Sequence, residues 1–282
     1  MRQYDPIKIL KTEIKIGLPK PVTFLHVTDS HVALDDPGND CGRARLFEKD
    51  KPGCCTDYFE QAADYAKEKH MMMLHTGDLI DFLSESNFVY ADRAFDGIES
   101  MYAAGNHDFC HCVGAAKEDE PYKWENMKRV APHFAQNLYF DSKVVQGVNV
   151  VTLDDSYYRI SDGQIAMLRA EAAKGYPILL CMHVPVFTRP LADLILGNGN
   201  PCCYLTCPEE AYLARFPEHR RLQQEPDEAT KRAVEYIKRE PLIRGIITGH
   251  VHLNYEEQLE NGAVQVTTHA GYAGYAREIT LL

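Results

Sequence analysis

The stretch IRGIITGHVHLNY, residues 243–255, joins an apolar run to a glycine and then to two histidines separated by one residue. The run 244–248 is rich in β-branched residues and predicts a buried strand. If the strand continued, His250 and His252 would project from one face of it, about 6–7 Å apart along the backbone. That spacing suits ligands of two neighbouring metal ions, and it also suits two unrelated surface histidines. Other segments of the chain distinguish these interpretations.

Polar residues that can bind metals also follow four other predicted strands. Loops converge on the carboxyl ends of strands in α/β sheets, so residues at these ends are expected to meet. A single Gly-Asp or Gly-Asn pair is usually a turn, whereas five such strand ends in one chain indicate a site. The residues are Asp29 and His31 after strand 22–28, Asp78 and Asp81 after 71–76, Asn106, His107 and Asp108 after 100–104, His183 at the end of 177–183, and His250 and His252 after 244–248.

Strand-like and helix-like segments alternate along the chain, which predicts an α/β architecture. Several apolar runs are continuous, as in strands covered on both faces. The helix-like segment 56–70 opens on Thr56, which we expect to be its N-cap. The remaining predicted strands are 148–153, 263–268 and 277–282, and the remaining predicted helices are 162–174 and 227–240.

Two segments resemble long inserted loops. Residues 33–55 are rich in glycine, proline and charge, and residues 187–224 form a second irregular stretch. Loops of this length inside a compact domain tend to be lids or binding loops. Neither resembles a flexible linker, so we expect one domain over residues 1–282.

The composition is that of a globular protein with an acidic surface. The 282 residues carry a formal net charge of −11, which argues against a nucleic-acid or membrane surface. The sequence contains no run of roughly 18–20 apolar residues, as a membrane span requires. It also shows no signal peptide, so we expect a cytoplasmic protein.

Nine cysteines, an odd number, argue against a complete disulfide framework and predict reduced thiols. Cys181 lies in an apolar run and is expected in the core. CCYLTC, residues 202–207, lacks the paired spacing of a zinc ribbon. The other cysteines are predicted to lie in loops: Cys41, Cys54, Cys55, Cys110, Cys112, Cys202, Cys203 and Cys207.

The order of motifs DxH, GDxxD, GNHD, H and GHxH, from residue 29 to residue 252, resembles the calcineurin-like metallophosphoesterase family. Within it, the motifs are most similar to the bacterial-type phosphodiesterase and phosphatase branch. The resemblance implies a four-layer α-β-β-α sandwich of two mixed sheets, with a dinuclear metal centre at the carboxyl ends of the strands.

The resemblance also implies a ligand set. Asp29, His31 and His252 would bind one ion, Asn106, His183 and His250 would bind the second, and the carboxylate of Asp78 would bridge the two. Oxygen and imidazole ligands without thiolate favour Mn, Fe or Zn, and are compatible with Mg, Co or Ni. The glycines before Asp78, Asn106 and His250 are expected to let the backbone turn sharply.

The implied activity is hydrolysis of a phosphodiester or phosphomonoester by a hydroxide that two metal ions activate. His107 would act as the general acid, and Asp81 would hydrogen-bond it and fix its tautomer. Asp108 is interpreted either as a loop-stabilising carboxylate or as a support for catalysis. Three residues near the motifs are candidates for substrate contacts: His111, Asn254 and Tyr255.

Two other classes of function remain as alternatives. One is a metal-binding interaction scaffold with weak catalysis, and the other is a nuclease, which the net charge disfavours. The expected substrate is a small phosphate ester, with cyclic nucleotides as one candidate class. The sequence leaves open the substrate, the native metal pair and the oligomeric state.

Overall fold

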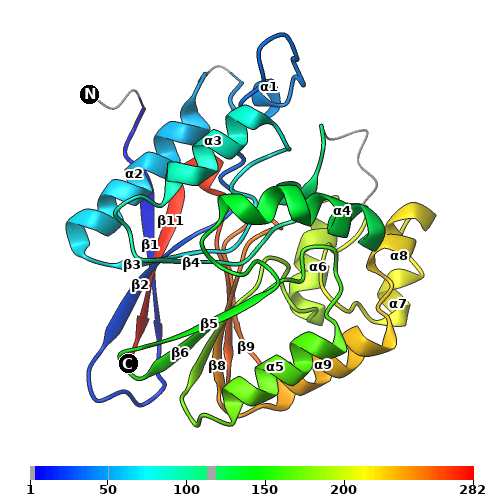
Figure 1. Cartoon of the computed structure of the whole chain (residues 1–282). Coiled ribbons are helices and arrows are strands. Elements are labelled where there is room, and N and C mark those ends of the chain that lie inside the picture. The colour runs from blue at the N-terminus through cyan, green and yellow to red at the C-terminus, as the bar shows by residue number, and fades with distance from the viewer. Residues whose placement is uncertain (1–3, 50, 113–118) are drawn as a thin grey trace.

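A computed structural model, which describes residues 4–49, 51–112 and 119–282, contains two mixed β-sheets packed face to face (Figure 1). The first has the strand order β1-β11-β2-β3-β4, and the second has the order β5-β6-β7-β8-β10-β9. The strands are β1 (Lys8–Ile14), β2 (Val22–Val27), β3 (Met72–His75), β4 (Ser100–Tyr102), β5 (Phe140–Val145), β6 (Val148–Leu153), β7 (Ile178–Cys181), β8 (Ile243–Thr248), β9 (Tyr255–Gln258), β10 (Val264–Thr267) and β11 (Tyr275–Leu281).

Strand directions place several carboxyl ends at the same edge of each sheet. In the first sheet β2, β3 and β4 are parallel, and in the second β6, β7, β8 and β10 are parallel. The sheets bury an apolar layer between them, to which Phe24, Leu74, Val150, Leu179 and Ile247 contribute. Because these side chains leave water, the layer stabilises the packing of one sheet on the other.

Helices cover the outer face of each sheet (Figure 1). α2 (Cys54–Lys69) and α3 (Glu85–Ala94) lie on the first sheet, and α5 (Asp162–Ala172) and α9 (Glu228–Arg239) lie on the second. The predicted fold class, a four-layer α-β-β-α sandwich of two mixed sheets, is therefore confirmed.

The three helices predicted from periodicity are present, with altered ends. α2 buries Phe59, Ala62, Ala63 and Ala66 on one stripe, as the spacing predicts. It begins two residues before Thr56, which is not its N-cap; the hydroxyl of Thr56 donates instead to the carbonyl of Gly53. α5 and α9 begin within one residue of their predicted starts, after capping residues Ser161 and Asp227.

The strands missed in the sequence all lie at sheet edges. β1, β5 and β9 are terminal in their sheets, and their sequences KILKTEI, FDSKVV and YEEQ mix charged with apolar residues. Exposed edges tolerate and often select charge, so the apolar run that reveals a central strand is absent.

β1 pairs with β11, so a segment near residue 10 and a segment near residue 280 lie in one sheet. Because of this pairing, we propose that residues 1–282 form one domain.

Residues 187–224 form an ordered helical insertion, so their assignment as an irregular stretch is wrong. They contain α6 (Arg189–Gly197), α7 (Glu210–Leu213) and α8 (Glu218–Gln224). α6 and α7 contribute to an apolar cluster that includes Leu191 and Phe216 together with Cys202 and Cys203. The insertion 33–55, apart from residue 50, holds the short α1 (Ala44–Phe47) and the start of α2. The remaining helices are α4 (Glu120–Val130) and the single turns η1 (His107–Phe109), η2 (Ala131–His133) and η3 (Gly271–Ala273).

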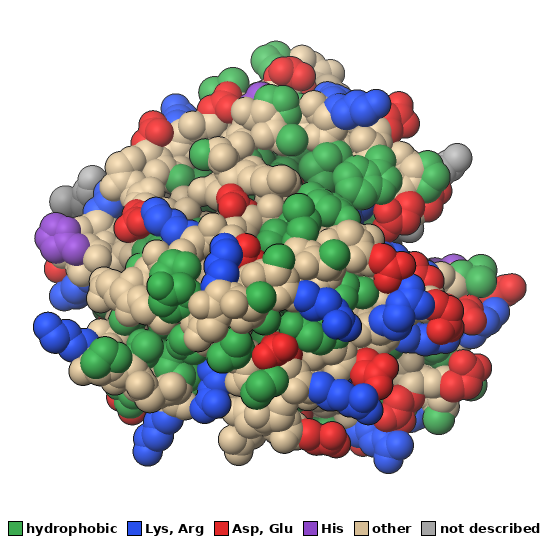
Figure 2. All heavy atoms as spheres, turned by 60° about the horizontal axis from the view of Figure 1, so that its bottom comes forward, with side chains coloured by type: hydrophobic (Ala, Val, Ile, Leu, Met, Phe, Trp, Pro, Cys, Tyr) green, Lys and Arg blue, Asp and Glu red, His purple; other side chains and the backbone are tan. Residues whose placement is uncertain are grey.

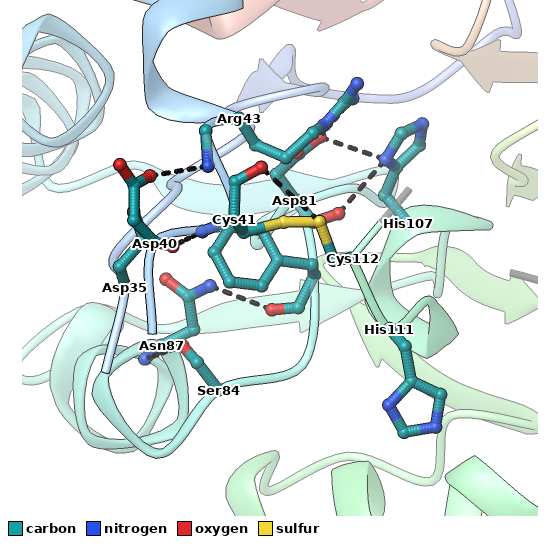
Figure 3. The surroundings of a disulfide bond; sticks show 12 residues. Asp35, Asp40, Cys41, Arg43, Asp81, Ser84, Asn87, His107, His111 and Cys112 are labelled. Carbon is teal, nitrogen blue, oxygen red and sulfur yellow. Dashed lines mark hydrogen bonds and ion pairs between the residues drawn. A yellow bond between two sulfur atoms is a disulfide. The ribbon is translucent and has the colours of Figure 1, made fainter. Parts of the chain in front are cut away.

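The prediction of reduced loop cysteines is wrong for several positions. Cys41 and Cys112, which are 71 residues apart in the sequence, form a disulfide (Figure 3). Cys54 and Cys55 are buried in the first turn of α2 rather than in a loop. No sequence pattern predicts the Cys41–Cys112 pair, because two cysteines so distant in sequence become adjacent only through the fold. Cys181 is buried in β7, as expected.

No helix among the described residues is long and apolar enough to cross a membrane. A cytoplasmic location stays a prediction. The Cys41–Cys112 disulfide is the observation that weighs against a strongly reducing compartment.

Candidate metal centre

The polar residues predicted to meet do so at the common edge of the two sheets. Asp29 and His31 follow β2, Asp78 follows β3 and Asn106 follows β4, all from the first sheet. The second sheet contributes His183 after β7 and both His250 and His252 after β8. Asp29, His31, Asp78, Asn106 and His183 are all buried.

One group of ligand atoms forms around His252. Its Nε2 lies 3.2 Å from Nε2 of His31 and 3.1 Å from Oδ1 of Asp29. Nε2 of His31 lies 3.8 Å from the same carboxylate oxygen. These three atoms converge on one point, as the ligands of a single ion would.

A second group forms around His183. Its Nε2 lies 3.2 Å from Oδ1 of Asn106 and 3.1 Å from Nδ1 of His250. Oδ2 of Asp78 lies 3.3 Å from this nitrogen and 3.7 Å from Nε2 of His31 in the first group. Asp78 therefore stands between the two groups, in the place that the resemblance implies for a bridging carboxylate.

His250 and His252 are not in a strand, so the expectation that they project from one strand face is wrong. β8 ends at Thr248, and the two histidines have φ angles of 66° and 50°. The left-handed backbone at both positions turns His250 towards His183 and His252 towards His31. They face different groups for this reason.

Hydrogen bonds on the outer ring nitrogens orient the ligand atoms inward. Nδ1 of His183 lies 2.6 Å from the carbonyl of Thr76, which can only accept, so the neutral ring presents a lone pair at Nε2. Nδ1 of His31 lies 2.9 Å from Asp81 in the same way. Such outer partners are typical of metal-binding histidines. The donor set therefore fits two metal ions, although metal binding by these residues stays a proposal.

Backbone strain is concentrated at the same residues. A non-glycine residue with positive φ costs about 1–3 kcal/mol and persists where the surroundings hold it. Here hydrogen bonds hold the loop, for example from the amide of His31 to the carbonyl of Asp78 at 2.9 Å. The strained candidate ligands are Asp29 (51°), His31 (45°), Asp78 (55°), His250 (66°) and His252 (50°).

The glycines before the candidate ligands serve two different purposes. Gly77 has φ of +93° and provides the sharp turn that was expected. At Gly105 and Gly249 the requirement is space. A Cβ atom on Gly105 would lie 2.2 Å from Oδ1 of Asp78, and one on Gly249 would lie 1.8 Å from Oγ1 of Thr28.

Asp81 contacts the candidate acid His107 (Figure 3) and also the candidate ligand His31. Its Oδ1 lies 2.9 Å from Nδ1 of His107 and 2.9 Å from Nδ1 of His31. Arg43 donates from Nε to Oδ2 of Asp81 at 2.6 Å. No motif or spacing in the sequence marks Arg43 as a residue of the site, because it lies in the insertion 33–55 and reaches Asp81 only through the fold.

Asp108 accepts hydrogen bonds from backbone amides of the motif loops. The donors are the N–H groups of Gly105 at 2.8 Å, Asp78 at 3.1 Å and Ile80 at 3.3 Å. The hydroxyl of Tyr102 also donates to it. These contacts favour the loop-stabilising interpretation of Asp108.

Burial and neighbouring charge set the pKa values in the centre. Burial alone would raise the pKa of Asp29, Asp78 and Asp81, but the histidines beside them lower it overall. Burial alone would lower the pKa of His107 and His183, but the nearby Asp78 raises it to about 9 and about 10, respectively. The polypeptide thus collects negative charge at this edge, which suits a cationic occupant.

A cavity of about 370 Å³ opens beside the two ligand groups. Its lining includes five residues of the sequence motifs: Asp78, Asn106, His107, His250 and His252. The other lining residues are ones that the motifs did not reveal: Arg43, Tyr158, Ile195, Asn200, Tyr204, Arg220, Gln223 and Val251.

The three predicted substrate contacts lie outside the described lining of this cavity. His111 is exposed, its amide donates to the hydroxyl of Tyr122, and its side chain points away from Asp81 and His107 (Figure 3). Asn254 accepts from Arg277 at 3.1 Å. Tyr255 packs against the apolar cluster of the insertion 187–224. A role for them in substrate binding stays a prediction.

Two sheets between helices, with two groups of nitrogen and oxygen ligands at their shared edge, define a candidate dinuclear metalloprotein. A family model described as calcineurin-like phosphoesterase matches residues 22–254. The chain belongs to the calcineurin-like phosphoesterase family, which confirms the resemblance seen in the motifs. Its membership places it among metal-dependent enzymes that hydrolyse phosphate esters.

One solved structure supports the same fold at low sequence identity, and two others are more weakly similar to the chain. A dimetal phosphatase from Danio rerio is 14% identical, and the match covers 89% of this chain and 88% of that one, with a TM-score of 0.54. The phosphopantetheinyl hydrolase from Mycobacterium tuberculosis is 11% identical over 88% of this chain and 90% of its own, with a TM-score of 0.40. A 5'-nucleotidase from Candida albicans is 10% identical over 95% of this chain and 48% of its own, with a TM-score of 0.41. No curated protein matches the chain.

Proposed function

We propose that the chain hydrolyses phosphate esters of small molecules with two metal ions at the described centre. The observation that carries this proposal is the position of Asp78, whose Oδ2 lies 3.3 Å from His183 and 3.7 Å from His31. One carboxylate oxygen between two groups of ligands suits a bridge between two ions. We assign Asp29, His31 and His252 to one ion and Asn106, His183 and His250 to the other.

The ligand chemistry narrows the choice of metals. Carboxylate, amide and imidazole ligands without thiolate favour Mn, Fe or Zn, while Mg, Co and Ni remain compatible. Bound there, two such ions would supply positive charge to the phosphoryl group and lower the pKa of water. The two carboxylates Asp29 and Asp78 would balance part of that charge.

His107 is proposed as the general acid. Its Nδ1 lies 2.9 Å from the carboxylate of Asp81, and the ring borders the cavity. Nε2 is then the atom that gives a proton to the leaving-group oxygen. Asp81 holds the ring in this orientation, and Arg43 holds Asp81 in turn.

The volume of the cavity and the net charge of the protein favour a small substrate over a nucleic acid. The cavity of about 370 Å³ accommodates a small ester. The net charge is −11, and the face in Figure 2 shows Lys and Arg side chains interspersed with Asp and Glu rather than gathered into one basic area. Phosphomonoesters and phosphodiesters, cyclic nucleotides among them, are all candidate substrates. The complete set of ligand residues argues against a scaffold without activity.

The test compares leaving groups in the His107→Asn variant. The alkoxide leaving group of an alkyl phosphate must be protonated as it leaves. The 4-nitrophenolate of 4-nitrophenyl phosphate is a stable anion and needs this proton far less. We expect kcat for the alkyl ester to fall about 10²–10⁴-fold, with a smaller loss for the nitrophenyl ester and unchanged metal content. His133→Asn, which alters a histidine paired with Asp92 and outside the described cavity lining, is the control. Equal losses with both esters would contradict the role of His107.

A further inference from the structure

The side chain of His252 is the most exposed of the three candidate ligands in its group. It is 30% exposed, whereas the side chains of Asp29 and His31 are 0% and 1% exposed. His252 also lies in a loop with positive φ, beyond the end of β8. Packing alone therefore restrains this imidazole less than its neighbours, and a contact on its outer ring nitrogen is needed to hold it towards them.

Tyr272 supplies this contact. Its Oη lies 3.3 Å from Nδ1 of His252, whereas Nε2 of the same ring faces the carboxylate of Asp29. A neutral imidazole that presents the lone pair of Nε2 to an ion carries its proton on Nδ1, so Nδ1 donates and the hydroxyl oxygen accepts. The hydrogen bond therefore favours the tautomer that can bind a metal, as outer partners do at other metal-binding histidines.

The ring of Tyr272 contacts both histidines of this group. Its centroid lies 5.3 Å from that of His252 and 5.6 Å from that of His31, edge to face in both pairs. Phe47, at the end of α1, stacks on His31 with 4.4 Å between centroids and meets Tyr272 edge to face at 4.9 Å. These are favourable geometries for aromatic rings, so Tyr272 and Phe47 restrain the two imidazoles together.

Backbone contacts fix the place of Tyr272. Its amide donates to the carbonyl of Asp29 at 3.1 Å, and the amide of Gly271 donates to the carbonyl of Thr28 at 2.7 Å. A Cβ atom on Gly271 would lie 3.0 Å from that carbonyl oxygen, so the glycine permits the close approach. η3 is therefore docked on the loop that carries Asp29 and His31, and Tyr272 is held in advance beside the ligands that it contacts.

We propose, on the basis of the metal centre proposed above, that Tyr272 is a positioning residue for the ion that His252 binds. Its hydroxyl fixes the tautomer and orientation of His252, and its ring acts with Phe47 to keep His31 in place. Within the described part of the chain, the ring contacts of Tyr272 are with these three residues. None of the three belongs to the second group of ligands, so Tyr272 acts on one ion of the two.

The test measures zinc binding by the metal-free protein in competition with a chelator. Tyr272→Phe removes the hydroxyl and keeps the ring. We expect the affinity for one ion to fall by about tenfold or more, while the affinity for the other ion and the free energy of unfolding change little. Tyr236→Phe is the matched control, because it removes a hydroxyl that donates to Glu240 at 2.8 Å, at the end of α9. This control should keep both affinities.

The ring-nitrogen resonances of the histidines in the zinc-loaded protein identify the imidazole that is affected. In the wild type we expect the proton of His252 on Nδ1. In Tyr272→Phe that N–H signal should shift and exchange faster with water. The signals of His183, whose Nδ1 donates to the carbonyl of Thr76, should stay in place. Phe47→Leu, which removes the stack on His31, should weaken the same ion and provides a second variant if the first folds poorly.

Two results would overturn the inference while leaving the proposed function intact. One is wild-type affinity for both ions in Tyr272→Phe and in Phe47→Leu. The other is equal weakening of the two ions, with equal shifts of the His183 and His252 signals. A wild-type protein that binds neither zinc, manganese nor iron would instead overturn the proposed metal centre, and this inference with it.

Discussion

The carboxylate of Asp81 lies 2.9 Å from Nδ1 of His107, and the same oxygen lies 2.9 Å from Nδ1 of His31. One side chain thus orients both the proposed general acid and a candidate metal ligand. Arg43 holds that carboxylate from the far side at 2.6 Å. Metal binding and proton transfer are therefore expected to depend on the same buried residue.

Asp81→Asn should impair both functions together. The amide is nearly isosteric but removes the negative charge that fixes the two imidazole rings, and loss of such an outer partner typically costs about 10–100-fold. We expect kcat/KM for a phosphate ester to fall by that factor, together with weaker metal binding in titrations. Asp92→Asn is the control, since Asp92 pairs with His133 at 2.8 Å on an exposed part of the surface. A variant with normal turnover and metal affinity would contradict the role of Asp81.

The residues of the candidate centre could be predicted from the sequence, because each follows a recognisable strand. Once Asp29, Asp78 and His183 are assigned to strand ends, the parallel strands bring them to one edge. The walls of the cavity could not be predicted. Arg43 and Arg220 come from insertions with no periodic pattern, and only the packing of those insertions aims them at the cavity.

The geometry of the histidine pair could not be predicted from the sequence either. The expectation of a continuing strand at His250 and His252 assumed extended backbone, while the loop adopts left-handed φ at both. Hydrogen bonds between distant segments stabilise this conformation, for example from the amide of His250 to Asp29 at 2.9 Å. Local propensity does not contain such long-range contacts.

Asp78→Asn should reduce the number of bound metal ions. A neutral amide is a weaker bridge than a carboxylate, so at least one ion should be lost or bound far more weakly. Metal analysis after dialysis measures this directly. Asp162→Asn, which alters an exposed partner of Arg232, is a suitable control. Two tightly held ions in Asp78→Asn would show that the bridging assignment is wrong.

Gly249→Ala should disturb the centre through steric contact alone. A Cβ atom there would lie 1.8 Å from Oγ1 of Thr28 and 2.3 Å from Oδ2 of Asp29, both buried. Overpacking of this kind costs about 1–3 kcal/mol, and displacement of Asp29 should also lower metal content. Gly197→Ala is the matched control, since a Cβ atom on Gly197 meets nothing within 4 Å. Equal stability and metal content of the two variants would contradict the close-approach argument.

Removal of the disulfide should destabilise the protein and loosen Arg43. The bond joins Cys41, two residues before Arg43, to Cys112 in the segment that follows His107 (Figure 3). We expect the Cys41→Ser, Cys112→Ser double variant to lose about 2–4 kcal/mol in free energy of unfolding, measured with denaturant. Turnover should fall as well, because Arg43 supports Asp81.

The wild-type protein treated with a reducing phosphine should behave like the double variant. Cys207→Ser, at a cysteine with a free thiol, is the control and should respond little. If neither reduction nor the double substitution changes stability, the bond does not contribute as proposed.

Asp155 should make stability depend on pH. Burial raises its pKa to about 7, although the amide of Val184 and the hydroxyl of Thr206 both donate to it. An acid with a raised folded-state pKa contributes stability that is complete below the unfolded pKa, near 4, and is lost as the pH rises to about 7. The Asp155→Asn variant has no ionisable group at this position, so its free energy of unfolding does not decrease in this way. Relative to wild type, the variant should therefore gain about 2–3 kcal/mol between pH 5 and pH 8. Denaturant unfolding of both proteins in chelator, which removes metal linkage, measures this gain, and a constant difference would contradict it.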